Sequence, residues 1–253
     1  MIVIKTPREQ DLMRKAGRVV GLVFEEIKDK IRPGLSTLDV ANMCEKVIRD
    51  NGATPTFLGY GGFKGAVCVS LNDEIVHGIP SKKRILREGD IVSVDVGATL
   101  NGYIGDACRT FVVGVAPMNA HRLVEVTEAS FWEGVKYAKP GNHLGDISHA
   151  IQEYVESRGY SIVREYTGHG VGHELHEDPY IPNYGEKGTG PLLKEGMCLA
   201  IEPMVNEGKK EIRVASDGWT ARTKDGKLSS HYENSILITK DGYEILTMVK
   251  EEI

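Results

Sequence analysis

Residues 87–95 read Arg-Glu-Gly-Asp-Ile-Val-Ser-Val-Asp, and residues 194–202 read Lys-Glu-Gly-Met-Cys-Leu-Ala-Ile-Glu. Both stretches pass from a basic-acidic-glycine step through an apolar run to a carboxylate. The copies lie 107 residues apart, and the same offset relates Pro33-Gly34 to Pro140-Gly141. A repeat of this length is too long for a solenoid and indicates two half-domains that face each other across a pseudo-two-fold axis.

Helices and strands are predicted in the same order in both copies. Thr6-Pro7-Arg8-Glu9 has the pattern of a helix capping box with proline in the first turn, so a long amphipathic helix should follow and end before Pro33. A second helix is predicted over 37–49. The corresponding helices of the second copy are expected over about 120–137 and 146–158, and segments rich in Val, Ile and Thr follow each pair. Helix, helix and sheet, repeated twice, predict an α+β fold.

The bulk properties predict one domain over residues 1–253, with halves of about 1–115 and 116–253. A net charge of −5 argues against a general nucleic-acid-binding role. We find no signal peptide and no membrane span in the sequence. The four cysteines are far apart and form no CxxC pair, so we expect reduced, mostly buried thiols and a cytoplasmic protein.

Asn101-Gly102 separates two runs of strand-forming residues and is a strong signal for a two-residue hairpin. In that register Asp95 and Asp106 share one face as diagonal neighbours, with Cβ atoms about 7 Å apart. Gly97, opposite Asp106, is expected to leave open space beside the acids. Two carboxylates on apolar strands repel each other and lose hydration unless a cation binds between them. The hairpin therefore predicts a metal site, with room for two ions about 3.5–4 Å apart.

The second half offers Glu202 and Glu233 as the matching acid pair, on a hairpin about twenty residues longer. The additional length lies near 208–227 and contains Trp219 and several lysines. Four carboxylates balance the charge of two divalent ions, and a neutral histidine can add a ligand without disturbing that balance. His169, within a glycine-rich segment, is the candidate.

Two further histidines are candidates for contacting substrate. His77 and His176 are each followed by a proline three residues later. Neither is needed to complete the ligand set, so we expect them to meet a substrate carbonyl or amide. The remaining histidines are interpreted as structural: His121, His143, His149, His173 and His231.

These motifs, taken in order, resemble the type I methionine aminopeptidase family. The resemblance covers nearly the whole chain and rests on His77-Gly78-Ile79-Pro80, Asp95, Gly105-Asp106, Gly168-His169-Gly170-Val171-Gly172, Ile201-Glu202-Pro203-Met204 and Glu233. It implies the pita-bread fold, a pseudo-symmetric duplication around a central antiparallel sheet. It also implies hydrolytic removal of the initiator methionine from nascent proteins, preferentially before small second residues.

The resemblance implies a ligand set for two divalent ions, which could be cobalt, manganese, iron or zinc. Asp95, Asp106 and Glu233 would hold one ion, and Asp106, His169, Glu202 and Glu233 the other. The free α-amine of the substrate would also coordinate a metal, which explains restriction to the first residue.

Catalytic and substrate-binding roles also follow from the resemblance. Glu202 would shuttle the proton to the leaving amine, His176 would steady the oxyanion and His77 the scissile amide. The methionine pocket would consist of Tyr60, Phe63, Cys68, Leu175 and Trp219. Phe57 stands where bacterial relatives often have a cysteine, and Leu175 where an aromatic ring is common.

Two other functions fit the sequence less well. A proline-directed peptidase of the same superfamily would bring an additional N-terminal domain, and a pita-bread protein that only binds partners would lack metal ligands. We expect a monomer that acts on nascent polypeptides, without membrane or nucleic-acid partners. Docking to the ribosome through the lysine-bearing hairpin is left open.

Overall fold

Two helices open each half of the molecule, in the predicted order. In the computed structural model, which describes residues 1–249, α1 (Pro7–Ile27) begins at Thr6, and the reciprocal capping box between Thr6 and Glu9 is formed. α2 (Thr37–Asp50) follows it. α3 (Met118–Val135) and α4 (Leu144–Glu156) open the second half, each starting two residues before its predicted position. The last four residues of the expected domain, 250–253, lie outside the described residues.

The strands form one large antiparallel sheet and two small sheets. The large sheet has the order β1-β4-β5-β14-β9-β7-β8, with β2 added beside β4 and β15 beside β14; the small sheets are β13-β10-β6 and β11-β12-β3. Their bounds are β1 (Thr54–Pro55), β2 (Cys68–Leu71), β3 (Glu74–Val76), β4 (Ile91–Leu100), β5 (Tyr103–Val112), β6 (Ser161–Ile162), β7 (Gly168–Gly170), β8 (Glu177–Ile181), β9 (Cys198–Ile201), β10 (Met204–Asn206), β11 (Ile212–Val214), β12 (Ala221–Thr223), β13 (Ser229–His231), β14 (Glu233–Ile238) and β15 (Tyr243–Ile245). A single 3-10 turn, η1 (Tyr60–Gly62), precedes β2.

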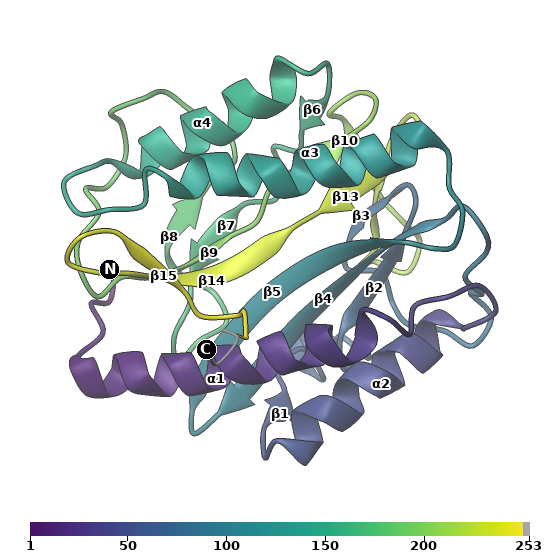
Figure 1. Ribbon diagram of the computed structural model, residues 1–253, viewed down its shortest axis with the longest axis horizontal. Helices are drawn as coiled ribbons and strands as arrows, with labels where there is room; N and C mark the ends of the chain where they lie inside the picture. Colours follow the sequence, from purple (N-terminus) through teal and green to yellow (C-terminus); the bar gives the residue numbers. More distant parts are fainter. Residues whose placement is uncertain (250–253) are drawn as a thin grey trace.

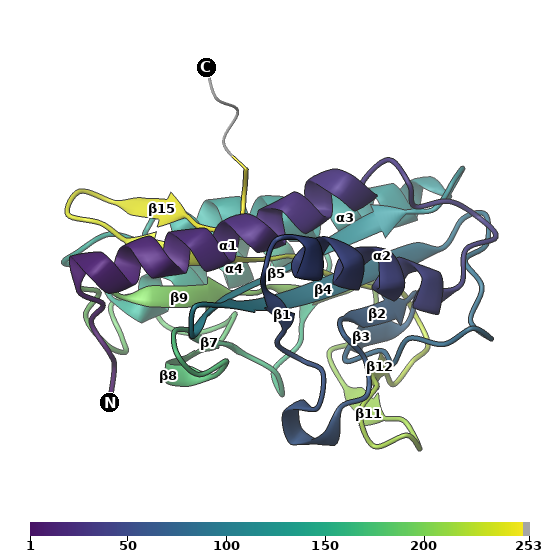
Figure 2. The same cartoon turned by 90° about the horizontal axis from the view of Figure 1, so that it is seen from below.

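All four helices cover the same face of the large sheet. Figure 1 shows α1 and α2 over one half and α3 and α4 over the other, and Figure 2 shows the opposite face left to β7, β8 and the β11–β12 hairpin. None of the described helices is long and apolar enough to cross a bilayer. Because the four helices cover one face of the sheet, the opposite, helix-free face is the one available for a site.

Strand alternation directs the acids toward that face. Val94 and Val96 of β4 join the core under α1 and α2, so Asp95 between them points the other way. Leu199 and Ile201 of β9 join the core under α3 and α4. The same alternation, continued one residue past the end of the strand, turns Glu202 toward the helix-free face.

The backbone itself repeats at the predicted offset of 107 residues. An isolated bridge pairs Ser36 with Ile85 in the first half, and another pairs His143 with Leu192 in the second. The duplication read from the sequence is therefore present in the hydrogen bonds as well as in the order of elements.

The strand registers confirm the first hairpin and correct one detail of the second. β4 and β5 pair Asp95 with Cys108 and Gly97 with Asp106, as the Asn101-Gly102 turn predicts. Across the centre of the sheet, β14 pairs Glu233 with Cys108.

This pairing changes which residues are counterparts. Because β9 and β14 pair Ile201 with Asn234, the pseudo-two-fold axis relates Cys108 to Glu233. The counterpart of Asp106 is therefore His231, not Glu233 as the sequence suggested. The error arose because the longer connection hides the register.

The first helix packs against the segment that follows β15, the last described strand. A Cβ on Gly17 would lie 2.4 Å from the carbonyl oxygen of Leu246, so only glycine allows this approach of the two backbones. Arg14 Nε also lies 3.0 Å from Glu244 Oε2. The beginning of the first half is thus fastened to the end of the second.

Candidate active site

One pocket on the helix-free face is lined by every residue selected from the sequence. Those residues are Tyr60, Phe63, Cys68, His77, Asp95, Asp106, His169, Leu175, His176, Glu202, Trp219 and Glu233. Phe57, Val76, Tyr166 and Thr167 complete the lining. Of these four, only Phe57 had been singled out in the sequence.

The five expected ligands converge at the base of the pocket. His169 Nε2 lies 3.5 Å from Glu202 Oε1 and 3.7 Å from Asp106 Oδ2. Asp95, Asp106 and Glu233 each have a buried carboxylate oxygen with no hydrogen-bond partner in the described part of the chain. Buried polar atoms are normally paired, so these unpartnered oxygens are suited to binding a cation.

The tautomer of His169 follows from its neighbour. Its Nδ1 lies 2.9 Å from the carbonyl oxygen of Gly170, which can only accept, so Nδ1 carries the proton. The lone pair on Nε2 then faces the carboxylates. A lone pair among anionic oxygens is repulsive without a cation between them.

Burial pushes the four acids and His169 toward their neutral forms by shifting their pKa values. It raises the pKa of Asp95 to about 7, and neighbouring His231 opposes that rise. Burial also raises the pKa values of Asp106, Glu202 and Glu233 well above their ordinary range, and it lowers the pKa of His169 to about 4. Divalent cations would allow the acids to ionise in place.

The donor set fits a hard or borderline divalent metal. Carboxylate oxygens and imidazole nitrogen are available, whereas burial raises the pKa values of Cys68 and Cys108 well above 9, so both thiols stay protonated. All four cysteines are buried and none is in a disulfide, which confirms the expected reduced thiols. The residues present therefore suit the metal that the motifs imply.

His231 is the residue that the sequence interpretation missed. The sequence interpretation groups it with structural histidines on helix surfaces or exposed turns. In the structure its side chain is buried. Its Nε2 lies 3.5 Å from Glu202 Oε2 and 3.9 Å from Glu233 Oε2. The signal available in the sequence was its position two residues before Glu233. Without the strand register, that position gave no reason to select it.

His176 is positioned beside the ligands by an aromatic hydroxyl. Its ring centroid lies 4.4 Å from that of His169, and its Nδ1 is 2.8 Å from the hydroxyl oxygen of Tyr60. The hydroxyl therefore helps to hold the ring beside the expected ligand His169. Burial lowers the pKa of His176, which favours the neutral imidazole.

His77, in the wall of the pocket, has an uncommon backbone conformation. Its φ is +61°, in the left-handed region that side chains rarely adopt. Thr220 Oγ1 donates to the carbonyl oxygen of His77 at 3.4 Å, and the N–H of Gly78 donates to Ser70 Oγ at 3.0 Å. The ring packs edge-on against Trp219, with centroids 6.3 Å apart.

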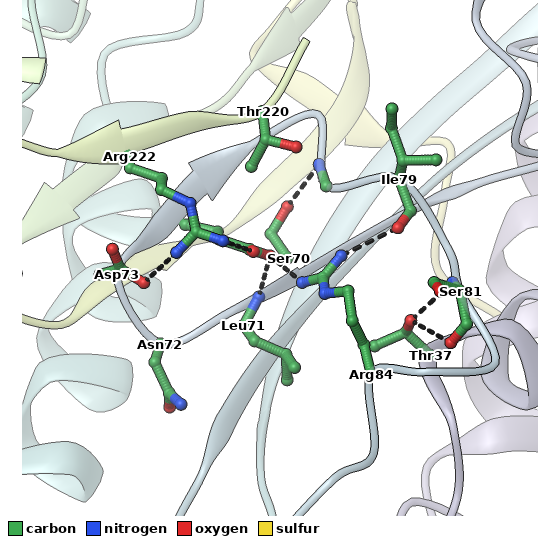
Figure 3. Close-up of polar contacts among 12 residues, drawn as sticks. Thr37, Ser70, Leu71, Asn72, Asp73, Ile79, Ser81, Arg84, Thr220 and Arg222 are labelled. Atoms are coloured by element: carbon green, nitrogen blue, oxygen red, sulfur yellow. Dashed lines mark hydrogen bonds and ion pairs between the residues drawn. The ribbon is translucent and has the colours of Figure 1, made fainter. Parts of the chain in front are cut away.

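A buried ion network supports the His77 segment from behind. Figure 3 shows the guanidinium groups of Arg84 and Arg222 pointing toward each other. Both pair with Glu74, whose side chain is only 3% exposed. Arg84 Nη1 also donates to the carbonyl oxygen of Ile79 at 2.9 Å, and Arg222 donates to Asp73 at 2.7 Å. Since Arg222 lies on β12, the network joins the β3 strand of the first half to the long excursion of the second.

The remaining wall is an apolar slot. Phe63 and Trp219 meet edge-to-face with centroids 5.2 Å apart, and buried Leu175 and Cys68 also line the pocket. The space over Gly97, expected to be open, is filled by the ring of Phe57, which a Cβ on Gly97 would approach to 2.6 Å. Gly97 is needed because an aromatic ring packs directly against its backbone.

Comparison with known proteins identifies the class to which this fold and site belong. The chain belongs to metallopeptidase family M24, whose family model matches residues 11–240. Family membership makes it a metal-dependent peptide hydrolase with the pita-bread fold.

Within that family the chain groups with the methionine aminopeptidases. Methionine aminopeptidase 1 of Bacillus subtilis is 53% identical over 249 residues, which cover 98% of this chain and all of the relative. The crystal structure of methionine aminopeptidase from Thermotoga maritima superposes with a TM-score of 0.97 at 51% identity, covering 98% of this chain and 100% of that chain. The prolidase from Pyrococcus furiosus is more distant: its TM-score is 0.78 at 27% identity, and this chain spans 98% of its own length but 66% of the prolidase.

Proposed function

We propose that this chain removes the initiator methionine from nascent polypeptides, preferentially before small second residues. The observation that carries the proposal is the convergence of four carboxylates and one imidazole beside an apolar slot in one pocket. A hydrolytic centre next to a slot for one unbranched side chain fits an exopeptidase that selects its first residue.

Asp95, Asp106, His169, Glu202 and Glu233 would hold two divalent ions, with Asp106 and Glu233 shared between them. Ions in this position supply Lewis-acid polarisation of the scissile carbonyl and bring the pKa of an attacking water toward about 7. Manganese, iron, cobalt and zinc all suit this donor set.

Glu202 is assigned to proton transfer. It lies at the pocket surface with a side chain 12% exposed, against 3% for Glu233, and can therefore meet both water and substrate. As a carboxylate it accepts a proton from the attacking water and later gives it to the leaving amine.

His176 is assigned to the developing oxyanion, a role that needs a proton on Nε2. The hydroxyl of Tyr60, donating to Nδ1, selects that tautomer. The neutral imidazole then donates from Nε2 to the carbonyl oxygen as charge develops there. His77, on the opposite wall, is assigned to the scissile amide.

Tyr60, Phe63, Cys68, Leu175 and Trp219 are assigned to the methionine side chain. Aromatic edges and aliphatic groups suit a flexible, polarisable thioether. The ring of Phe57 narrows the slot further.

The decisive assay uses two peptides. Protein loaded with Co(II) or Mn(II) is expected to release methionine from Met-Ala-Ser and to leave Xaa-Pro peptides largely intact. Release from Xaa-Pro alone would replace this proposal with a prolidase activity. Metal content after anaerobic purification would identify the ion, and Met-Leu-Ser beside Met-Ala-Ser would measure the preference for small second residues.

We place this activity on a monomer in the cytosol. Four buried thiols, none of them in a disulfide, fit a reducing compartment. Light scattering behind size-exclusion chromatography would test the oligomeric state. Sedimentation with and without ribosomes would test docking through the lysines that flank the β11–β12 hairpin: Lys209, Lys210, Lys224 and Lys227.

A further inference from the structure

We propose that His231 is a further metal ligand, so that this centre binds its two ions with two imidazoles. The inference rests on the proposed function and deepens it, because it adds a residue to the same metal centre. His231 would coordinate through Nε2, beside Glu202 and Glu233.

The first argument is the symmetry of the fold. His231 occupies in the second half the position that Asp106 occupies in the first. The N–H of Asp106 donates to Ser235 Oγ at 3.0 Å, and that hydroxyl donates to the carbonyl oxygen of Asp106 at 2.8 Å.

His231 has the matching arrangement with Thr110. Its N–H donates to Thr110 Oγ1 at 3.1 Å, and the hydroxyl donates to the carbonyl oxygen of His231 at 2.8 Å. Ser235 and Thr110 are themselves counterparts under the same pseudo-two-fold relation. Two equivalent backbone positions, each bracketed by one hydroxyl, therefore direct side chains toward one centre.

The second argument is the environment of the ring. His231 is 1% exposed, and neither of its ring nitrogens has a hydrogen-bond partner in the described part of the chain. Its Nε2 lies 3.5 Å from Glu202 Oε2 and 3.9 Å from Glu233 Oε2, beyond hydrogen-bond distance. Such spacings are suited to donors arranged around a common ion.

The third argument is the composition of the two donor groups. Asp106, His169 and Glu233 place donor atoms within 4.8 Å of one another, and so do Glu202, His231 and Glu233. Each group has one imidazole and two carboxylates, and Glu233 belongs to both. Without His231, the only imidazole ligand would be His169.

An imidazole in each group has a consequence for metal choice. Imidazole favours cobalt, iron, nickel and zinc, whereas an all-oxygen site also suits manganese and magnesium. We therefore do not expect either ion position to prefer manganese. Replacing His231 should weaken Co(II) binding at one position more than it weakens Mn(II) binding there.

The first test counts imidazoles in the unmodified protein. X-ray absorption at the cobalt edge measures imidazole scattering per ion, and elemental analysis gives ions per chain. Two coordinated imidazoles per chain would support the proposal, and one would overturn it. This count does not depend on whether the protein folds after substitution, nor on whether it cleaves a peptide.

The second test uses matched variants in the metal-binding assay. Calorimetric titration of His231→Gln with Co(II) is expected to show at least a tenfold loss of affinity at one position, of the order seen when a metal's supporting groups are removed. His121→Gln, on α3 outside the site, should bind as the unmodified protein does. His169→Gln should retain one imidazole signal, and the double variant with His231→Gln none.

The outcomes separate this proposal from the proposed function. Unchanged Co(II) affinities and an unchanged imidazole count in His231→Gln would show that the residue only packs beside the ligands. Failure to release methionine from Met-Ala-Ser, with two imidazoles still counted, would refute the peptidase activity and leave the ligand assignment standing.

Discussion

The two hairpins that carry the acids share one ladder geometry but are joined in different ways. β4 and β5 are connected by the two-residue turn Asn101-Gly102. β9 and β14 are separated by an excursion that contains the strands β10 to β13 and Trp219. The first connection only reverses the chain, whereas the second adds a wall to the pocket.

Matched positions in the two hairpins also carry different chemistry. Asp95 stands opposite Cys108, whose thiol stays neutral because burial raises its pKa. The second ladder, continued by one residue from the Ile201–Asn234 pair, places Glu202 opposite Glu233. The duplicated backbone thus supplies equivalent positions, but the second half fills more of them with groups that can bind ions or transfer protons.

The comparison is tested most sharply by replacing one acid in each half, Glu202 and Asp95, with its amide. Glu202→Gln should lower kcat on Met-Ala-Ser by about 10²–10⁴-fold, because it removes the proposed proton carrier. Asp95→Asn should chiefly weaken metal binding, so a higher Co(II) concentration should restore much of its activity. Steady-state kinetics across a metal titration measures both effects.

Circular dichroism should show native structure in both of these variants. Near-normal turnover by Glu202→Gln would remove its assignment as proton shuttle. Rescue of Glu202→Gln by excess metal would mean that the two halves contribute in the same way.

The network that joins the halves should matter for stability. Glu74→Gln leaves Arg84 and Arg222 without their central carboxylate, and we expect a loss of about 3 kcal/mol in the free energy of unfolding. Glu45→Gln, which breaks an exposed pair with Arg49 on α2, should cost less than about 0.5 kcal/mol. Urea unfolding of both variants measures the difference, and equal values would contradict the role of the network.

Without metal, the stability of the protein should depend on pH, because acids from both halves are then gathered without a cation. In the metal-free protein Asp95 keeps its proton up to a pH of about 7, above its value in an unfolded chain. The native state then binds more protons than the unfolded state, so the free energy of unfolding falls as the pH rises toward about 7. His169, with its pKa lowered to about 4, acts in the opposite direction only below about pH 6.5.

Metal binding displaces a proton from Asp95 only where the metal-free protein still holds it, so the measurement is best made between pH 5 and 7. Added Co(II) should stabilise the protein more at pH 7 than at pH 5, by about 1.4 kcal/mol per pH unit for each proton that it displaces. Thermal unfolding with chelator and with metal measures this difference. A stabilisation that does not change with pH would mean that the carboxylates are already ionised without metal.

The smallest effect concerns a contact between the halves. Tyr60→Phe removes the hydroxyl that meets His176 Nδ1, so the Nε2–H tautomer is no longer selected. We expect kcat for Met-Ala-Ser to fall about tenfold with little change in KM, since the contact supports the transition state rather than substrate binding. A rise in KM at constant kcat would instead assign Tyr60 to the methionine pocket alone.

Features set by local patterns could be predicted from the sequence. The Thr6–Glu9 capping box fixed the start of α1, and Asn101-Gly102 fixed the register that brings Asp95 beside Asp106. The second acid pair and the three pocket histidines also followed from residue patterns. The family resemblance added the expected methionine pocket, whereas three lining residues were not predicted: Val76, Tyr166 and Thr167. Each of these depends on a few neighbouring residues or on a short motif.

Features set by long-range packing could not be predicted. The counterpart of Asp106 depends on how β14 aligns with β9, and the excursion that contains β10 to β13 separates these two strands along the chain. His231 was therefore placed among structural residues. Phe57 was noted only as a departure from the bacterial pattern, because nothing local shows that its ring folds over Gly97.

The contact between Gly17 and Leu246 also sets an order of events during synthesis. As the polypeptide leaves the ribosome, α1 emerges among the first segments, yet the backbone against which it closes is among the last. Until residues near 246 arrive, the earliest helix lacks one of its permanent neighbours. Catalytic competence should therefore come as a single late step in biogenesis rather than half by half, although the architecture is built from two copies.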